Sequence, residues 1–174
     1  DQTKKILASN SSLCVEATVY HGGVPIGGQP RVTATRRGCP NPRWWEWLEF
    51  ELSLCNLPRG ARLCFTLLGE SGGQQVPLGW VNIQLFDYRH RLVSGPHSLP
   101  LWPNAAANPI GTCSPNLMPA VPTLEVEFEC FALPIVYPTS NRADTEQLPQ
   151  PAIQQLPALR QLAQRDPLYT LTPQ

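Results

Sequence analysis

The chain has 174 residues, of which 42% are hydrophobic and 15% are charged. Thirteen basic and thirteen acidic side chains leave a formal net charge of zero, which excludes nucleic-acid binding driven by bulk charge. Twenty prolines and twelve glycines interrupt the sequence too often for long helices, so an all-α fold is excluded. No apolar run is long enough to cross a membrane and the first residues are polar, so we expect neither a membrane span nor a signal peptide.

Alternation of apolar and polar residues predicts a series of short strands. Leu48, Phe50 and Leu52 would lie on one face of such a strand, opposite Glu49 and Glu51. In chain order, the expected strands cover residues 13–19, 31–35, 48–54, 62–68, 78–86, 98–101 and 124–130. Segments rich in turn formers separate them at 21–23, 38–42, 57–60, 69–77 and 104–122. We therefore predict an all-β fold, an antiparallel β-sandwich of about eight strands.

The composition changes after Tyr137. Residues 138–151 are polar and rich in turn formers, which predicts a linker. Residues 157–165 favour a short helix, because Pro157 suits a first helical turn and Pro167 ends the helix. Its apolar stripe of Leu159 and Leu162 cannot be buried by the helix alone, which predicts a neighbouring element.

Six cysteines are scattered along the chain, without a C-x-x-C pair or a nearby histidine to complete a zinc site. Four of them lie in or beside apolar strand-like runs: Cys14, Cys55, Cys64 and Cys130. A free cysteine in such a run behaves as a small hydrophobe. We predict reduced, buried thiols, no metal centre and a cytosolic setting.

A serine-hydrolase motif is present in outline. Residues 69–73 fit G-x-S-x-G around Ser71, and the run His21-Gly22-Gly23 is similar to an esterase oxyanion loop. A nucleophile elbow needs a helix directly after the serine, whereas residues 74–77 lead back into a strand. No G-x-x-x-x-G-K-[ST] run that would bind phosphate is present. We therefore expect a glycine-rich hairpin, with no catalytic residue and no cofactor site in this chain, and we keep a hydrolase only as a third alternative.

Surface charges and tryptophans remain as candidates. Asp87 is the only aspartate expected in a sandwich loop, too few carboxylates for a calcium site. Two arginine clusters, Arg31, Arg36, Arg37 and Arg43 around one turn and Arg89 with Arg91 in another, are solvated loop charges or, if both face one side, contacts to anionic lipid. The alternation that points Leu48 inward also points Trp44 inward and Trp45 and Trp47 outward, which predicts a covering partner.

Several motifs resemble those of a known family. Residues 41–50, NPRWWEWLEF, resemble the opening of a central C2-domain strand. More specific are VYHGG at 19–23, NLPRGARLCF at 56–65, GWVNIQLFDY at 79–88, LWP at 101–103 and NPIG at 108–111. Over residues 13–131 this set resembles the C2 domain of a class I phosphoinositide 3-kinase catalytic subunit, and residues 165–172 resemble the lead-in to that family's helical domain.

The resemblance implies a C2-type β-sandwich over residues 1–137 and, over 138–174, a linker and the start of a helical domain. The parent protein would be a cytoplasmic lipid kinase, peripheral to the membrane when active, that phosphorylates the 3-hydroxyl of phosphoinositides. ATP and magnesium would bind in a kinase domain outside this chain, and the C2 segment itself would not be an enzyme. The implied partners are the coiled coil of a regulatory subunit, the helical and kinase domains of the same chain, and a phospholipid membrane approached without calcium.

Two sets of residues follow as candidate sites. By resemblance, the surface expected at the regulatory coiled coil comprises His21, Gly22, Gly23, Asn104, Asn108 and Gly111. The residues expected to face an anionic membrane are Arg36, Arg37, Arg89 and Arg91. Two loops are shorter than is usual in the family, since residues 70–76 lack a lysine-rich insertion and residues 104–107 lack an acidic one. The alternative is a free-standing or class II-type, calcium-independent phospholipid-binding C2 module.

Overall fold

The structure is a computed structural model that describes residues 12–39, 41–71 and 73–138. Within these ranges every strand pairing is antiparallel, which confirms the all-β sandwich. The elements are β1 Ser12–His21, β2 Val24–Pro25, β3 Arg31–Val32, β4 Arg36–Arg37, the 3₁₀ turn η1 Leu54–Asn56, β5 Arg62–Ser71, β6 Gln74–Gln84, β7 Gly95–Pro100, β8 Trp102–Pro103 and β9 Thr123–Phe128. The linker and helix expected over residues 139–174 lie outside the described residues.

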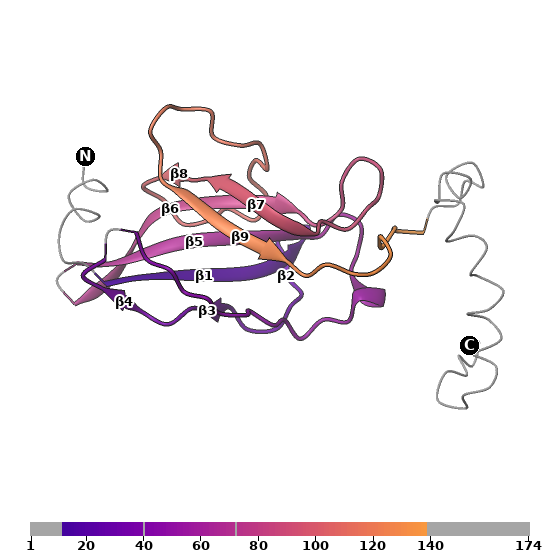
Figure 1. Ribbon diagram of the computed structural model, residues 1–174, viewed down its shortest axis with the longest axis horizontal. Coiled ribbons are helices and arrows are strands. Elements are labelled where there is room, and N and C mark those ends of the chain that lie inside the picture. Colours follow the sequence, from indigo (N-terminus) through magenta and orange to yellow (C-terminus); the bar gives the residue numbers. More distant parts are fainter. Residues whose placement is uncertain (1–11, 40, 72, 139–174) are drawn as a thin grey trace.

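A seven-stranded sheet forms one layer, with β1, β5 and β6 at its centre (Figure 1). Strand β1 pairs with β5 from Leu13 to Tyr20 and with β2, β3 and β4 along its other edge. Prolines and glycines between residues 25 and 38 break that edge into three short pieces. Strands β5 and β6 form a long hairpin with a register shift between Leu67 and Leu68.

The core lies between this sheet and a second layer that contains the β7–β9 pair. Alternate residues of the large sheet enter the core, among them Val15, Ala17, Phe65 and Val81. From the second layer come Leu99, Leu124 and Val126, together with Trp44, Leu48, Phe50 and Leu52 of an extended segment. Burial of these side chains is the main term that stabilises the sandwich.

The opposite face of the large sheet is also covered. The connection between β8 and β9, predicted as a loop over residues 104–122, crosses it and buries Cys64, Thr66 and Asn82. The central strands therefore have two buried faces. Their sequences nevertheless alternate between apolar and polar residues, as is typical of strands with one face in solvent. Polar residues on the second face are accommodated because the connection supplies backbone partners for them.

Three expectations about local structure were wrong. Residues 48–52 do alternate between core and solvent, but residues 48–54 form no strand ladder, and Leu54 is 45% exposed and begins η1. Residues 69–77 are mostly strand, since β5 and β6 continue to the pair Ser71–Gln74. Of the four cysteines expected to be buried, Cys14 and Cys64 are buried, whereas Cys55 and Cys130 are exposed because their segments leave the sheets.

The sandwich has two ends that matter for function. Strand β1 spans roughly 30 Å at about 3.3 Å per residue. Strand β4 lies near the start of β1, where it pairs with Ser12 and Leu13 (Figure 1). Strand β2 and the end of β6 lie near the finish of β1, since Tyr20 pairs with Arg62 of β5, and Arg62 pairs with Gln84 of β6. We call these the β4 end and the β2 end. Within the described part of the chain, no helix has the length and apolarity that a membrane crossing requires.

Candidate interaction surfaces

The Asn108–Gly111 loop is fixed to the outer face of the large sheet by buried Asn82 and half-buried Arg62. The Asn82 Nδ2 atom donates to the carbonyls of Asn108 at 2.7 Å and Thr112 at 3.2 Å. Arg62 Nη1 donates to the carbonyls of Gly111 at 2.7 Å and Pro109 at 3.3 Å. Within the loop, Gly111 N–H donates to the Asn108 carbonyl at 2.9 Å. Each such bond contributes about 1 kcal/mol, so the loop has a defined shape although Asn108 is exposed.

The His21–Gly23 turn lies against this loop. A Cβ atom built at Gly23 would lie 3.1 Å from Ile110 Cγ2, and one built at Gly60 would lie 3.3 Å from the His21 ring. Gly22 and Gly23 both have positive φ, a conformation that favours glycine. Ile110 is 72% exposed between the two segments. Together, His21, Gly22, Gly23, Asn108 and Gly111 form one surface, which we call the NPIG surface.

The sixth residue predicted for this surface lies elsewhere. Asn104 directly follows β8, and its backbone N–H donates to the Leu78 carbonyl at 2.9 Å. Leu78 and Asn82 are four residues apart on β6, roughly 13 Å in an extended strand. The structure therefore brings five of the six predicted residues together and separates Asn104 from them.

The two arginine pairs expected to face a membrane lie at opposite ends of the sandwich. Arg36 and Arg37 form β4, whereas Arg89 and Arg91 lie in the loop after β6, whose last residue, Gln84, pairs with Arg62 at the β2 end. Asp87 Oδ1 accepts the backbone N–H groups of Arg89 and Arg91, both at 2.8 Å, so the carboxylate of the only sandwich-loop aspartate stabilises that turn. The condition that both clusters share one side is met only if the long axis lies along the lipid surface.

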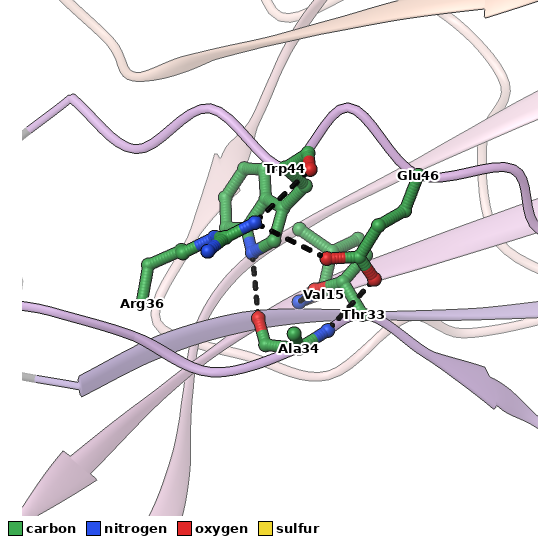
Figure 2. Close-up of polar contacts among 6 residues, drawn as sticks. All are labelled: Val15, Thr33, Ala34, Arg36, Trp44 and Glu46. Atoms are coloured by element: carbon green, nitrogen blue, oxygen red, sulfur yellow. Dashed lines mark hydrogen bonds and ion pairs between the residues drawn. The ribbon is translucent and has the colours of Figure 1, made fainter.

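A polar clip attaches the extended segment around Trp44 to the edge of the large sheet (Figure 2). Trp44 Nε1 donates to the Ala34 carbonyl at 2.9 Å, and Ala34 N–H donates to Glu46 Oε2 at 2.9 Å. Arg36 Nη2 donates to the Trp44 carbonyl at 3.2 Å, and the guanidinium lies 3.6 Å from Glu46 Oε1. These bonds hold residues 44–46 against the sheet edge through side chains, without strand pairing.

The clip holds two indoles in solvent. Trp45 is 85% exposed and Trp47 is 73% exposed, while Trp44 packs on the core, which confirms the predicted orientations. Trp45 has a φ of 55°, an unusual value for a bulky L-residue that costs about 1–2 kcal/mol. The Arg43 guanidinium lies 6.0 Å from the centroid of the Trp45 ring. Such strain persists only where surrounding contacts impose it, here those of Trp44 and Glu46.

The hydrolase-like run around Ser71 is followed by a strand and not by the helix that a nucleophile elbow needs. Ser71 is the last residue of β5 and the chain returns as β6 from Gln74, so the G-x-S-x-G run lies on a hairpin as predicted. Among the described residues, no three histidine, cysteine, aspartate or glutamate side chains are grouped as metal ligands. Burial raises the pKa of the Cys64 thiol to about 12, with neighbouring Cys113 as a further cause, and burial also raises the pKa of Cys14. These thiols are poor nucleophiles at neutral pH.

Sequence reasoning did not assign the residues that fix the NPIG surface. Asn82 is 2% exposed, and Thr66 Oγ1 accepts the Ala107 N–H at 3.0 Å. Their polar character in otherwise apolar strands was a usable signal, because a polar residue on a central strand needs a partner. The partners themselves are 26 and 41 residues away in sequence, so no local pattern identifies them.

Comparison with known proteins gives consistent results. Residues 9–129 match the model of the phosphoinositide 3-kinase C2 family. Phosphatidylinositol 3-kinase 3 of Dictyostelium discoideum is 31% identical over 170 residues, which cover 91% of this chain and 10% of that protein. Phosphatidylinositol 3-kinases 1 and 2 of the same organism are 34% and 36% identical over 119 and 110 residues, covering 59% and 55% of this chain.

The chain spans a tenth or less of the length of these relatives, since the shares of the other two are 8% and 6%. The matched region includes both sheets and the NPIG surface. On the basis of this match and the antiparallel sandwich, the chain belongs to the phosphoinositide 3-kinase C2 domain family.

Proposed function

We propose that this chain is the non-catalytic C2 module of a class I phosphoinositide 3-kinase catalytic subunit, whose NPIG surface docks on the coiled coil of a regulatory subunit. The parent enzyme phosphorylates the 3-hydroxyl of phosphoinositides, with ATP and magnesium bound in its kinase domain. The relatives' names as phosphatidylinositol 3-kinases support the lipid-kinase assignment.

The observation that carries the proposal is the convergence of two fixed, exposed turns. The loop carbonyls are held by Asn82 and Arg62, and the His21–Gly23 turn contacts Ile110. A surface that is ordered before binding loses little conformational freedom when it docks. Exposed Asn108 and His21 offer polar groups around the apolar Ile110, a composition that suits the mixed surface of a helix in a coiled coil.

Contacts at the β2 end hold the last described residues of the chain. Tyr137 N–H donates to the His90 carbonyl at 2.7 Å, and the Tyr137 ring packs edge-on against Phe86 with centroids 5.3 Å apart. Leu92 N–H likewise donates to the Ile135 carbonyl at 2.8 Å. These contacts anchor the chain at the β2 end, the end that also carries the NPIG surface. We infer that the helical and kinase domains pack from this side.

The test uses the full-length parent subunit co-expressed with the tagged coiled coil of its regulatory subunit. Ile110→Glu is expected to lower recovery of the complex about tenfold or more, because it places a charge at the centre of the contact. Leu117→Glu is the matched control, since Leu117 is 87% exposed on the same connection and lies outside the NPIG surface. Equal recovery of the two variants would show that the NPIG loop is only a connector.

We also propose that the parent enzyme approaches anionic membranes without calcium, with Arg89 and Arg91 or Arg36 and Arg37 nearest the lipid. The exposure of all four arginines favours this role. Such binding is electrostatic, and we expect it to require anionic lipid and to weaken with salt. The test is sedimentation of the parent subunit with phosphatidylserine-containing vesicles. Chelation of calcium should not change the binding, whereas one of the two double variants, Arg89→Gln/Arg91→Gln or Arg36→Gln/Arg37→Gln, should abolish it. Binding that neither double variant reduces would contradict the proposal.

A further inference from the structure

The tryptophan pair has no role in the functions proposed above, although Arg36 of its clip is one of the arginines proposed to face the membrane. Trp45 and Trp47 are two residues apart and are 85% and 73% exposed, so this short segment presents two indoles to solvent. Tryptophan is enriched at interfaces, where its ring meets an apolar environment and its N–H meets a polar one. A strained backbone at Trp45 is maintained by the Trp44 and Glu46 contacts, which keeps the ring in water when it has no partner.

Charges around the pair are almost balanced. Between residues 31 and 51 there are four arginines and three glutamates, a difference of one positive charge. Glu46 and Glu51 are neutralised by Arg36 at 3.6 Å and Arg31 at 2.9 Å, and Glu49 is exposed. Because the net charge is small, electrostatic attraction to an anionic surface contributes little here. Whatever covers this surface must be bound mainly by the indoles.

An indole combines a large apolar ring with one N–H donor, which suits the boundary between lipid headgroups and acyl chains. Arg43, at 6.0 Å from the Trp45 centroid, places a guanidinium beside the ring, where a headgroup phosphate would lie. Arg43 and Glu46 are sequence neighbours of the two tryptophans, so the apolar rings and charged groups that could meet lipid headgroups lie on one short segment.

We propose that Trp45 and Trp47 form a lipid-insertion site that enters the interface of zwitterionic membranes at the β4 end, with Arg43 on a headgroup phosphate. This proposal shares with the proposed membrane approach only that both bring the protein to a lipid surface. It differs in chemistry, since insertion depends on the indoles and not on anionic lipid. It is independent of the coiled-coil contact, which lies at the other end of the sandwich.

The experiment uses the 174-residue chain with vesicles of phosphatidylcholine alone and of phosphatidylcholine with phosphatidylserine. We expect sedimentation with both, little change between low and high salt, and quenching of tryptophan fluorescence by brominated phosphatidylcholine. Trp45→Ala/Trp47→Ala should lower the partition coefficient about tenfold or more. Leu117→Ala/Met118→Ala, which removes an equally exposed apolar pair elsewhere, should not.

Three results would contradict the proposed lipid-insertion site. These are the absence of quenching in the wild-type chain, equal partitioning of the tryptophan variant, or binding that appears only with phosphatidylserine and disappears in salt. The last would leave the arginine-driven approach intact while removing the insertion site. If vesicles leave the fluorescence unchanged but the tryptophan substitutions abolish a protein complex of the parent subunit, the surface docks a protein and the lipid proposal is wrong.

Discussion

The two ends of the sandwich expose different kinds of group: the β2 end exposes shaped backbone turns, and the β4 end exposes large aromatic side chains. At the β2 end, the NPIG surface is a backbone surface: its loop carbonyls are held by Asn82 and Arg62, and glycines shape the facing turn. At the β4 end, the exposed groups are the large rings of Trp45 and Trp47, held outward by a clip of side-chain bonds. A backbone surface of fixed shape suits one particular protein partner. Protruding rings suit a fluid partner that adapts to them.

The largest effect is expected where a buried group fixes the NPIG surface. Asn82→Leu removes both Asn82 donors and leaves the carbonyls of Asn108 and Thr112 without their partners. We expect the free energy of unfolding to fall by about 2–3 kcal/mol. Denaturant unfolding measures the loss. Thr66→Val, which removes one bond to Ala107, is a milder comparison, and a loss below about 0.5 kcal/mol for Asn82→Leu would show that the anchor is not needed.

An intermediate effect is expected at the clip. Trp44→Phe keeps an aromatic ring on the core and removes the bond from Nε1 to the Ala34 carbonyl. The expected cost is about 1 kcal/mol in the free energy of unfolding. Trp47→Phe, a matched change on a side chain that is 73% exposed, should be neutral. Equal losses for the two variants would contradict the distinction between inward and outward tryptophans.

A smaller effect of opposite sign is expected at Trp45. Asn adopts a positive φ more readily than a bulky residue does, so Trp45→Asn should raise the free energy of unfolding by about 0.5–1 kcal/mol. The same variant should lose vesicle partitioning. Thermal or denaturant unfolding gives the first quantity. A loss of stability would mean that the ring contributes more to folding than the strain removes.

The smallest effect on stability near neutral pH is expected at the cysteines. Because the folded pKa of Cys64 is raised from the ordinary 9.0 to about 12, its contribution to stability is complete below pH 9 and is lost as the pH rises toward 12. At pH 8, iodoacetamide should modify exposed Cys39, Cys55 and Cys130 much faster than buried Cys14 and Cys64. Peptide mass spectrometry measures this order. Early modification of Cys64 would contradict its burial.

These contrasts also show what the sequence could predict. Alternation located the strands around Val15, Phe65 and Val81, because burial of every second residue leaves a local pattern. It also oriented Trp44 and Trp45 correctly although no ladder forms there, since side-chain direction depends on the core and not on strand pairing. The resemblance to a family brought His21 and Asn108 together, but it placed Asn104 with them.

The remaining features depend on distant contacts. Whether Asn82 meets Asn108, or Trp44 meets Ala34, is decided by how the connections cross the sheet. The separation of the Arg36 and Arg89 clusters likewise follows from the length of β1 and the direction of β6, not from any local run. Sequence patterns therefore predicted the layers and many of the candidate residues, while the assembly of each surface required the fold.

Hydrogen exchange of the full-length parent subunit tests most directly whether the two ends serve different partners. It would be measured alone, with the regulatory coiled coil, and with phosphatidylcholine vesicles. We expect the coiled coil to protect residues 21–24 and 108–112 and to leave residues 43–47 unchanged, and we expect vesicles to do the reverse. Protection of the same end by both partners, or of neither end by either partner, would contradict the account.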